Sequence, residues 1–517
     1  MSFLKIQLCQ RQYNLIYITI YLLILVNLTT CILANNNEKQ RPNIIFIMAD
    51  DLGVGEVGLF PSKNPHGNID TPNLDMLATE GIRFTQAYAG YTVCAPSRTT
   101  LFTGRHSGNF FKYNLSGTAI KPDEIETLPK YLKSAGYNTA LVGKSAPLTS
   151  PIESGFDYFI GQIDQSACHN MYPYKIDYDV GKQVELKLNQ ENKRSRENCM
   201  SNPSAYNYTV DITQSHSINW IHSIYQDKNP FFLYMSFTVP HAGGWGSSPK
   251  DPEQGAPVPS DLQYANENTW PDVEKDHAAV ITYLDHYVGD IIQTLQKLNI
   301  DNNTLIIFAS DNGAHLEGGH DYKFFNSTGG LKGHKRSLFE GGVRSPTLIR
   351  WPNVVKPNQV SNLQFGFFDI LPTLCDIGGC FESLPKDLDG ISIYNELKGE
   401  PQEDHEYIMF TWNGLGVPPI IQSTSNNINL LSKSGYSIRV GDFKGIVPFC
   451  NDGVTNQPSM KDDMQLYNLI NDPFEENDVS DVHKDVVLRL KTLIISKDVS
   501  CKCYQCGAWN EGIEYDS

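Results

Sequence analysis

Six polar residues that follow short apolar runs are the first candidates for chemistry in this sequence. They are Asp50, Asp51, Lys144, His241, Asp311 and Asn312. The carboxylate and amide oxygens among them are hard donors, which suit calcium or magnesium better than zinc. A single aspartate after a strand is as often a helix N-cap as a metal ligand. A metal site therefore requires that these residues converge on one place.

The apolar runs predict buried strands that would carry these residues to one edge of a sheet. We expect strands at Asn43–Ala49, Thr139–Val142, Phe231–Phe237 and Thr304–Ala309, with a long amphipathic helix through Val280–Leu298. Strands that alternate with helices predict an α/β fold with a large, mostly parallel mixed sheet flanked by helices. Such sheets bind ligands beyond the carboxyl ends of their strands, where the six polar residues follow.

Cys94 is a further candidate because of the residues around it. It opens the run Cys-Ala-Pro-Ser-Arg, and Leu-Phe-Thr-Gly-Arg follows and ends at Arg105. This stretch resembles the signature of the sulfatases, in which the cysteine of Cys-x-Pro-x-Arg is oxidised during secretion to formylglycine. A hydrated aldehyde carries two hydroxyls, so one can attack sulfur and the other can expel sulfate, whereas a serine could take only the first step. The alternative is an ordinary buried or disulfide-bonded cysteine.

The resemblance to arylsulfatase-type sulfatases implies a role for each candidate. One calcium ion would be held by Asp50, Asp51, Cys94 in its modified form, Asp311 and Asn312. Calcium would stabilise the charge that develops on the sulfate oxygens. Arg98 would hold the formylglycine hydroxyls, while Lys144 and Lys335 would bind sulfate. His241 would bind the substrate and protonate its leaving oxygen.

The residues after Lys144 depart from the family pattern. Many sulfatases continue Gly-Lys with Trp-His, and that histidine contacts formylglycine, whereas this chain has Ser145 and Ala146. His169, in Cys-His-Asn-Met-Tyr-Pro, and His320, in Gly-Gly-His-Asp, lie in segments that resemble those of bacterial-type arylsulfatases. We therefore hypothesise that one of these two histidines enters the substrate site instead.

The first residues have the layout of a secretory signal peptide. Lys5 and Arg11 precede an apolar run from Leu15 to Val26, and small and polar residues follow toward Ala34. We expect cleavage after residues 1–34; an uncleaved membrane anchor is the competing interpretation. Cleavage predicts a secreted or lysosomal protein with no stable membrane insertion. The family resemblance adds a formylglycine-generating enzyme as a partner during secretion.

The cysteines fit the same route. Of eleven cysteines, Cys9 and Cys31 leave with the signal peptide and Cys94 is modified, so eight remain. They are Cys168, Cys199, Cys375, Cys380, Cys450, Cys501, Cys503 and Cys506. This even number predicts up to four disulfides, with their pairing left open. The last three could instead form a zinc knuckle, although a fourth ligand is missing nearby. Glycosylation sequons stand at Asn114, Asn207, Asn302 and Asn326.

Composition and motifs also suggest the domain organisation. The 517 residues, 40% of them hydrophobic, suffice for one large core and a smaller one, and the net charge of -17 argues against a nucleic-acid partner. We expect a catalytic domain over residues 35–375 and a small C-terminal α+β domain with an antiparallel sheet and a Cys-rich tail over 376–517. Residues 413–434 read as a long irregular segment that borders the substrate cleft.

The sequence thus predicts an alkaline-phosphatase-like sulfatase that hydrolyses sulfate monoesters of a small molecule or glycan to inorganic sulfate and an alcohol or phenol. Two alternatives stay open. One is a phosphate or phosphonate ester hydrolase of the same superfamily, which shares the metal site. The other is an inactive secreted binding protein on the same scaffold, which the missing histidine suggests. The intact Cys94 signature argues against the binding protein, because a binding role does not require it.

Overall fold

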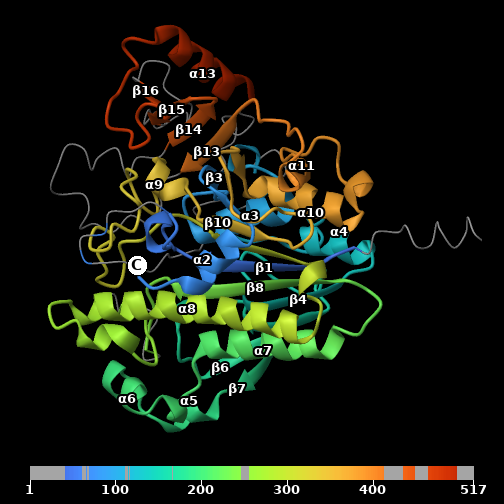
Figure 1. Cartoon of the computed structure of the whole chain (residues 1–517), viewed down its shortest axis with the longest axis vertical. Helices are drawn as coiled ribbons and strands as arrows, with labels where there is room; N and C mark the ends of the chain where they lie inside the picture. The colour runs from blue at the N-terminus through green and yellow to red at the C-terminus, as the bar shows by residue number, and fades with distance from the viewer. Residues whose placement is uncertain are drawn as a thin grey trace, which may run out of the picture. The chain divides into compact units, whose positions relative to one another are not determined.

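The computed structural model describes residues 41–60, 64, 66, 69–110, 115, 117–165, 167–245, 255–412, 435–448 and 464–497. The chain from Pro42 onward forms one compact unit, in which a large sheet carries helices on both faces (Figure 1). The predicted signal peptide, the segment 413–434 and the Cys-rich tail lie outside the described residues, so these expectations stay predictions.

The large sheet has ten strands in the order β11-β2-β10-β9-β1-β8-β4-β5-β6-β7. Their bounds are β1 Asn43–Asp50, β2 Ile82–Phe84, β4 Asn138–Lys144, β5 Tyr158–Gln162, β6 Lys175–Asp179, β7 Lys182–Glu185, β8 Phe231–Pro240, β9 Thr304–Ser310, β10 Thr347–Arg350 and β11 Gln359–Ser361. The central strands β9, β1, β8, β4 and β5 are parallel, whereas β10 and β6 join the sheet antiparallel. The predicted mostly parallel mixed sheet is confirmed.

The central strands are apolar along their whole length because both faces of the sheet are covered. In β1, Ile45 and Ile47 belong to one buried cluster, while Ile44, Phe46 and Met48 belong to another on the opposite face. Successive side chains of a strand point to opposite faces, so one strand supplies both cores.

Helices cover the two faces in two groups (Figure 1). The helices are α2 Pro72–Thr79, α3 Cys94–Thr103, α4 Leu128–Ser134, α5 Lys187–Glu191, α6 Arg196–Ser201, α7 Thr209–Ile224, α8 Asp272–Lys297, α9 Glu340–Val343, α10 Ile370–Gly378, α11 Tyr394–Lys398 and α13 Lys484–Lys497. Helices α2, α7 and α8 pack into the first buried cluster. Helices α3, α4 and α10 pack into the second. The predicted long amphipathic helix is α8.

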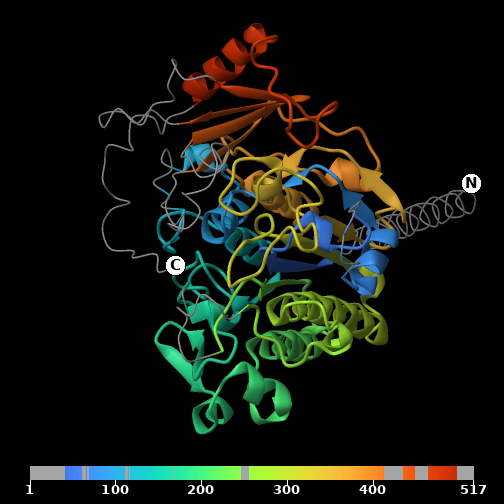
Figure 2. The same ribbon diagram turned by 90° about the vertical axis from the view of Figure 1, so that its left-hand side faces the viewer.

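A separate antiparallel sheet follows near the end of the described chain (Figure 2). It consists of β13 Ile408–Trp412, β14 Gly435–Val440, β15 Phe443–Pro448 and β16 Gln465–Asn468 in that order, and it packs against α13. The Nζ atom of Lys444 in β15 lies 2.8 Å from Glu340 Oε1 and 3.0 Å from Glu475 Oε1, all three side chains being buried. The domain limit expected at residue 376 falls inside α10, and the limits of the two domains stay a prediction.

The cysteines differ from the expectation. Cys375 and Cys380 form a disulfide, but Cys168 and Cys199 are buried free thiols. Two free thiols among the eight cysteines leave at most three of the up to four disulfides that the sequence predicts, and Cys375–Cys380 is one of them. Burial raises the pKa of Cys168 to about 12, so this thiol stays neutral. The other four cysteines of the predicted set lie outside the described residues.

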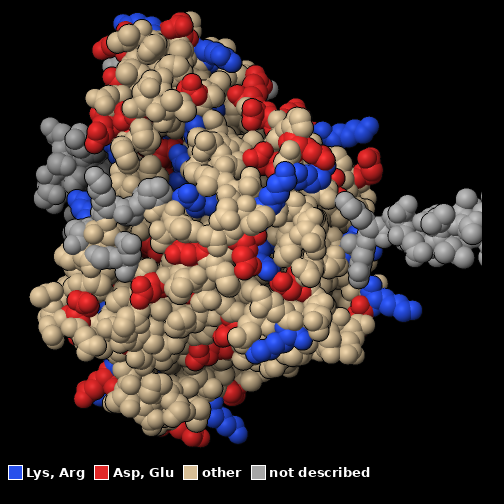
Figure 3. Space-filling view, in the orientation of Figure 1, with Lys and Arg blue, Asp and Glu red and all other residues tan. Residues whose placement is uncertain are grey.

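The surface of the described residues carries charges of both signs. On the face shown in Figure 3, basic and acidic side chains are interspersed. Among the residues that the structure describes, no helix has the length and apolar character needed to cross a membrane.

Candidate active site

The carboxyl ends of four parallel strands bring the predicted polar residues together. Asp50 is the last residue of β1 and Lys144 the last of β4, while His241 and Asp311 directly follow β8 and β9. The strands are neighbours in the order β9-β1-β8-β4. Their ends form one edge of the sheet, which is where ligands of such sheets bind.

Helix α3 presents Cys94 and Arg98 to this edge. Cys94 is the first residue of the helix, and Val93 before it is extended. Arg98 lies four residues later and therefore on the same side of the helix. Its Nε donates to Asp311 Oδ2 at 2.8 Å, and its Nη2 lies 3.4 Å from Asp50 Oδ2. Both carboxylates hold the pKa of Arg98 well above its usual range against the effect of burial.

Three aspartates and Asn312 form a buried oxygen cluster beside Cys94. Ligand atoms of Asp50, Cys94 and Asp311 lie within 4.8 Å of one another. The Asn312 Nδ2 donates to Asp51 Oδ1 at 2.7 Å. Two buried oxygens of this cluster, Asp50 Oδ1 and Asn312 Oδ1, have no hydrogen-bond partner. Buried oxygens without a donor fit a hard cation that would satisfy them, so the residues present fit the expected calcium.

The charges in this cluster favour a cation as well. Burial and the nearby Asp50 charge raise the pKa of Asp311 to about 7. Burial alone would also raise the pKa of Asp50. The cations of Lys144 and Arg98 outweigh this effect and hold the pKa of Asp50 well below its usual range. Like charges this close repel each other in a buried place, and a divalent cation would relieve that repulsion.

Two buried lysines flank the oxygen cluster. Lys144 Nζ donates to Asp50 Oδ2 at 2.7 Å and lies 3.2 Å from His169 Nε2. Lys335 Nζ donates to Asp51 Oδ2 at 2.8 Å. Against the effect of burial, the neighbouring carboxylates hold the pKa of both lysines above the usual range. Both side chains are therefore charged, and each is paired with a carboxylate of the cluster.

His241 points one ring nitrogen into the site. Its Nδ1 lies 2.6 Å from the carbonyl oxygen of Ala242, which can only accept, so Nδ1 carries a proton. Its Nε2 lies 2.8 Å from Lys335 Nζ. The ring stacks on His169 with 3.7 Å between the ring centroids. Nε2 is thus the nitrogen that can exchange a proton with a bound substrate.

His169 lies in the site, but His320 lies in a different cluster. His320 Nδ1 is 2.7 Å from Glu274 Oε2, and the ring stacks on His277 at 3.6 Å. His277 Nε2 in turn lies 2.6 Å from Glu56 Oε1. Glu56, His277 and His320 could also hold a metal ion by proximity, but each histidine is already paired with a glutamate. Helix α8 supplies Glu274 and His277, and both of them contact the ring of His320. The substrate contact expected for His320 stays a prediction.

We expect His320→Gln to lower stability while leaving turnover of the folded enzyme near normal. The amide of glutamine takes the place of histidine Nε2 rather than of Nδ1, so Glu274 Oε2 loses the hydrogen bond from His320 while Oε1 keeps the N–H of Asp321. A buried carboxylate oxygen that loses its partner costs about 1–3 kcal/mol. Urea unfolding measures the loss of stability. The value of kcat per folded molecule, with an aryl sulfate as substrate, measures turnover. His241→Gln is the matched control, because it should lose turnover with little loss of stability. A large fall in kcat for His320→Gln in folded protein would contradict this assignment.

Several contacts in the site were not expected from the sequence. Glu317 Oε2 lies 2.8 Å from Lys335 Nζ and 3.4 Å from His241 Nε2. Ser236 accepts a hydrogen bond from Arg98. Gln165 Nε2 donates to Cys94 Sγ at 3.1 Å. Of these three residues, only Glu317 could have been linked to the site from the sequence, because it closely follows the Ser-Asp-Asn-Gly run. Ser236 lies within an apolar strand and Gln165 lies in a loop, so neither has a pattern that points to the site.

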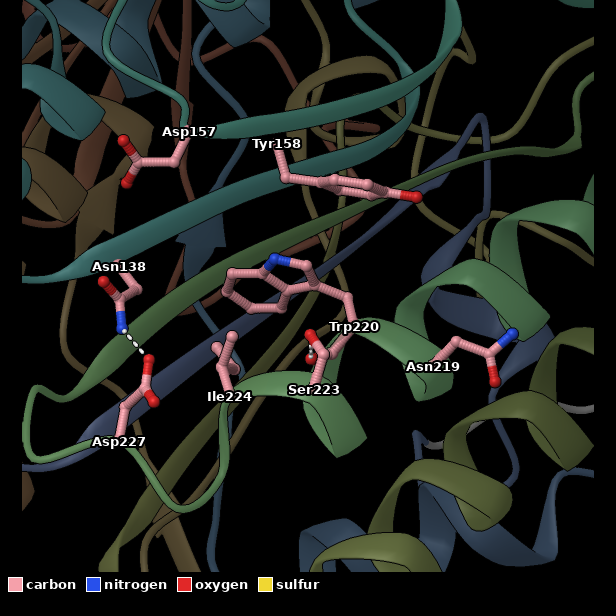
Figure 4. Close-up of a pocket in the computed structure, with 8 residues that line it drawn as sticks. All are labelled: Asn138, Asp157, Tyr158, Asn219, Trp220, Ser223, Ile224 and Asp227. Atoms are coloured by element: carbon pink, nitrogen blue, oxygen red, sulfur yellow. Dashed lines mark hydrogen bonds between the residues drawn. The ribbon is translucent and has the colours of Figure 1, made fainter.

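A surface cavity of about 460 Å³ lies elsewhere on the molecule (Figure 4). It is lined by Asn138, Asp157, Tyr158, Asn219, Trp220, Ser223, Ile224 and Asp227. Asn138 is the first residue of β4 and Lys144 the last, so the cavity and the catalytic edge lie roughly 20 Å apart at a strand rise of about 3.3 Å per residue. This cavity is therefore not where the candidate residues meet.

Comparison with known proteins decides the family. The sulfatase family model matches residues 42–380. This chain belongs to the sulfatase family. A sulfatase is a sulfuric ester hydrolase, so the reaction class is the hydrolysis of sulfate esters, and the fold is the alkaline-phosphatase-like one expected from the sequence.

The sulfatase resembles relatives that act on sulfated sugars. It is 29% identical over 527 residues to the N-acetylgalactosamine-6-O-sulfatase of Bacteroides thetaiotaomicron, covering 89% of this chain and 94% of the relative. It is 29% identical over 390 residues to the N-acetylgalactosamine-6-sulfatase of Mus musculus, covering 70% and 67%. The crystal structure of Ps i-CgsB in complex with k-i-k-neocarrahexaose matches with a TM-score of 0.67 and 26% identity, covering 89% and 94%.

Proposed function

We propose that this sulfatase hydrolyses sulfate monoesters of glycans with formylglycine at residue 94 and one calcium ion. The observation that carries the proposal is the oxygen cluster beside Cys94, in which donor atoms of Asp50, Cys94 and Asp311 lie within 4.8 Å of one another. Arg98 and two lysines border the same cluster. A nucleophile, a place for a cation and groups that bind an anion are thus side by side.

Asp50, Asp51, Asp311 and Asn312 would hold the calcium ion. When bound, calcium supplies positive charge near the sulfate, and hydrated formylglycine supplies one hydroxyl that attacks sulfur and a second that allows sulfate to leave. In the structure, Lys144 and Lys335 are paired with the Asp50 and Asp51 carboxylates. A cation that takes over the charge of these carboxylates would leave both ammonium groups to the ester.

The remaining tasks fall to side chains of this chain. Arg98 orients the hydroxyls of residue 94, because its guanidinium is fixed by Asp311 and Asp50 within 3.4 Å. Lys144, which lies beside Asp50, and Lys335, which lies beside Asp51, bind the sulfate oxygens and neutralise their charge. His241, whose Nε2 accepts a hydrogen bond from Lys335 at 2.8 Å, takes up a proton at Nε2 and passes it to the departing oxygen.

Several relatives support a glycan as the substrate class. Two of them are named for the 6-sulfate of N-acetylgalactosamine, and a solved structure of similar fold contains a carrahexaose. We therefore propose a glycan sulfate as the substrate, with 6-O-sulfated N-acetylgalactosamine as the first candidate. The chain is proposed to follow the secretory route, where a formylglycine-generating enzyme modifies Cys94, and to act in a lysosome or outside the cell.

A panel of esters tests the proposed function. Purified enzyme from a eukaryotic host should release sulfate from 6-O-sulfated N-acetylgalactosamine faster than from steryl or simple alkyl sulfates, and faster than it releases phosphate from an aryl phosphate. Elemental analysis of the same preparation should find calcium, and thorough chelation should remove activity. Preference for phosphate or phosphonate esters would support the rival hydrolase, and full activity after chelation would contradict the calcium assignment.

A further inference from the structure

Gln165 is an unexpected residue whose side chain contacts residue 94. Its Nε2 donates to Cys94 Sγ at 3.1 Å. Its other amide atom, Oε1, is buried and has no hydrogen-bond partner. A buried carbonyl oxygen without a donor is costly, which suggests that the mature enzyme supplies a donor that unmodified cysteine does not.

We propose that Gln165 is a positioning residue that holds residue 94 in its hydrated form. This inference rests on the proposed function, because it concerns the formylglycine expected at Cys94. It assigns to Gln165 the contact that a histidine makes in many sulfatases, where this chain has Ala146.

Neither residue that replaces the usual Trp-His pair can make this contact. The methyl group of Ala146 has no donor or acceptor. The Ser145 Oγ donates to the carbonyl oxygen of Leu148 at 3.2 Å, within its own loop. Gln165 instead reaches the nucleophile from the loop after the neighbouring strand β5, which pairs with β4 so that Gln162 is opposite Lys144.

The loop that carries Gln165 is held in place by its neighbours. The backbone N–H of Ala167 donates to Asp164 Oδ1 at 2.9 Å, and the Ile163 N–H donates to Asp177 Oδ2 at 3.0 Å. The buried thiol of Cys168 donates to the carbonyl oxygen of Gln165 at 2.8 Å. This contact gives the free thiol a role, since it fixes the backbone from which the amide side chain extends.

An amide can distinguish the hydrate from the aldehyde. Hydration adds the oxygen of water to the carbonyl carbon, and a proton reaches the former carbonyl oxygen, so that two hydroxyls result. Gln165 Nε2 can donate to oxygen in either form, but Oε1 can accept a hydrogen bond only from a hydroxyl of the hydrate. One hydrogen bond made in only one of two states shifts their equilibrium by about two- to twelve-fold.

The test is the ratio of hydrate to aldehyde in holoenzyme labelled with ¹³C-cysteine, read by ¹³C NMR. Gln165→Ala should raise the aldehyde to hydrate ratio by about five-fold, and it should speed the labelling of residue 94 by an aminooxy probe. It should also lower kcat equally for activated and unactivated sulfate esters. Gln165→His should restore much of the ratio, because an imidazole can replace the amide as an acceptor.

Gln359→Ala is the matched control, because Gln359 is an exposed glutamine of β11 whose Nε2 donates to the carbonyl oxygen of Pro357 at 3.1 Å and does not contact the Gln165 loop. Peptide mass analysis must show the same fraction of formylglycine in each variant. An unchanged ratio in folded, fully modified Gln165→Ala would overturn the inference and leave the proposed function intact. If wild-type enzyme is active with unmodified cysteine at residue 94, the formylglycine mechanism fails, and this inference fails with it.

Discussion

Cys94→Ser should reduce steady-state hydrolysis of an aryl sulfate by about 10⁵-fold or more, the scale of losing the nucleophile in other hydrolases. Serine has one hydroxyl, so it can accept a sulfate but has no second hydroxyl to expel it. The variant should therefore release at most one equivalent of phenol and then stop. Mass analysis of the peptide that contains residue 94 should show one added sulfate group on the serine.

Cys199→Ser is the control for the loss of a buried thiol. Cys199 is fully buried in α6 and is a free cysteine like Cys94, but the site residues do not include it. This variant should keep turnover of the folded molecules. Repeated turnover by Cys94→Ser at a rate near that of wild type would contradict the two-hydroxyl mechanism.

His241→Ala should slow esters with poor leaving groups far more than activated ones. The Nε2 of His241 faces the site beside Lys335, and a proton from it matters most when the departing oxygen is strongly basic. General acid catalysis contributes about 10²- to 10⁴-fold. We expect losses of that size for sugar or alkyl sulfates and a much smaller loss for nitrophenyl sulfate, measured as kcat/KM.

Lys144→Ala is the matched control for this comparison. Lys144 is proposed to bind the sulfate group, which both kinds of ester share, and its Nζ contacts Asp50 and His169 rather than His241, so its loss should slow both by similar factors. Equal losses for the two kinds of ester in His241→Ala would exclude the role of His241 as general acid.

The strands and the residues at their ends could be predicted because both follow from local patterns. Short apolar runs fix the buried strands β1, β4, β8 and β9, and parallel strands carry the residues after them to one edge. The contact of Arg98 with the site follows from its place one helical turn after Cys94. None of these steps requires knowledge of distant pairings.

Other features depend on contacts between distant segments and could not be predicted. His320 stands near Asp311 in the sequence, yet its partner Glu274 comes from α8. Cys168 belongs to an even set, but disulfide formation needs two cysteines close in space, and Cys168 instead supports the Gln165 loop. Gln165 itself lies in a polar loop whose course sequence patterns do not define.

The burial of helix α3 would limit when the proposed modification of Cys94 can take place. Every residue of α3 is buried in the folded chain, so a modifying enzyme has no access to Cys94 once the fold is complete. Arg98 of α3 pairs with Asp311, which lies 213 residues further along the chain. Contacts between residues so far apart in the sequence form slowly during folding. On the proposed secretory route, Cys94 would thus stay accessible until the segment up to β9 has been synthesised. If Cys94 is oxidised as proposed, the active fraction of a preparation would be set by kinetic competition between that oxidation and folding of the sheet, and conditions that slow folding should increase the active fraction.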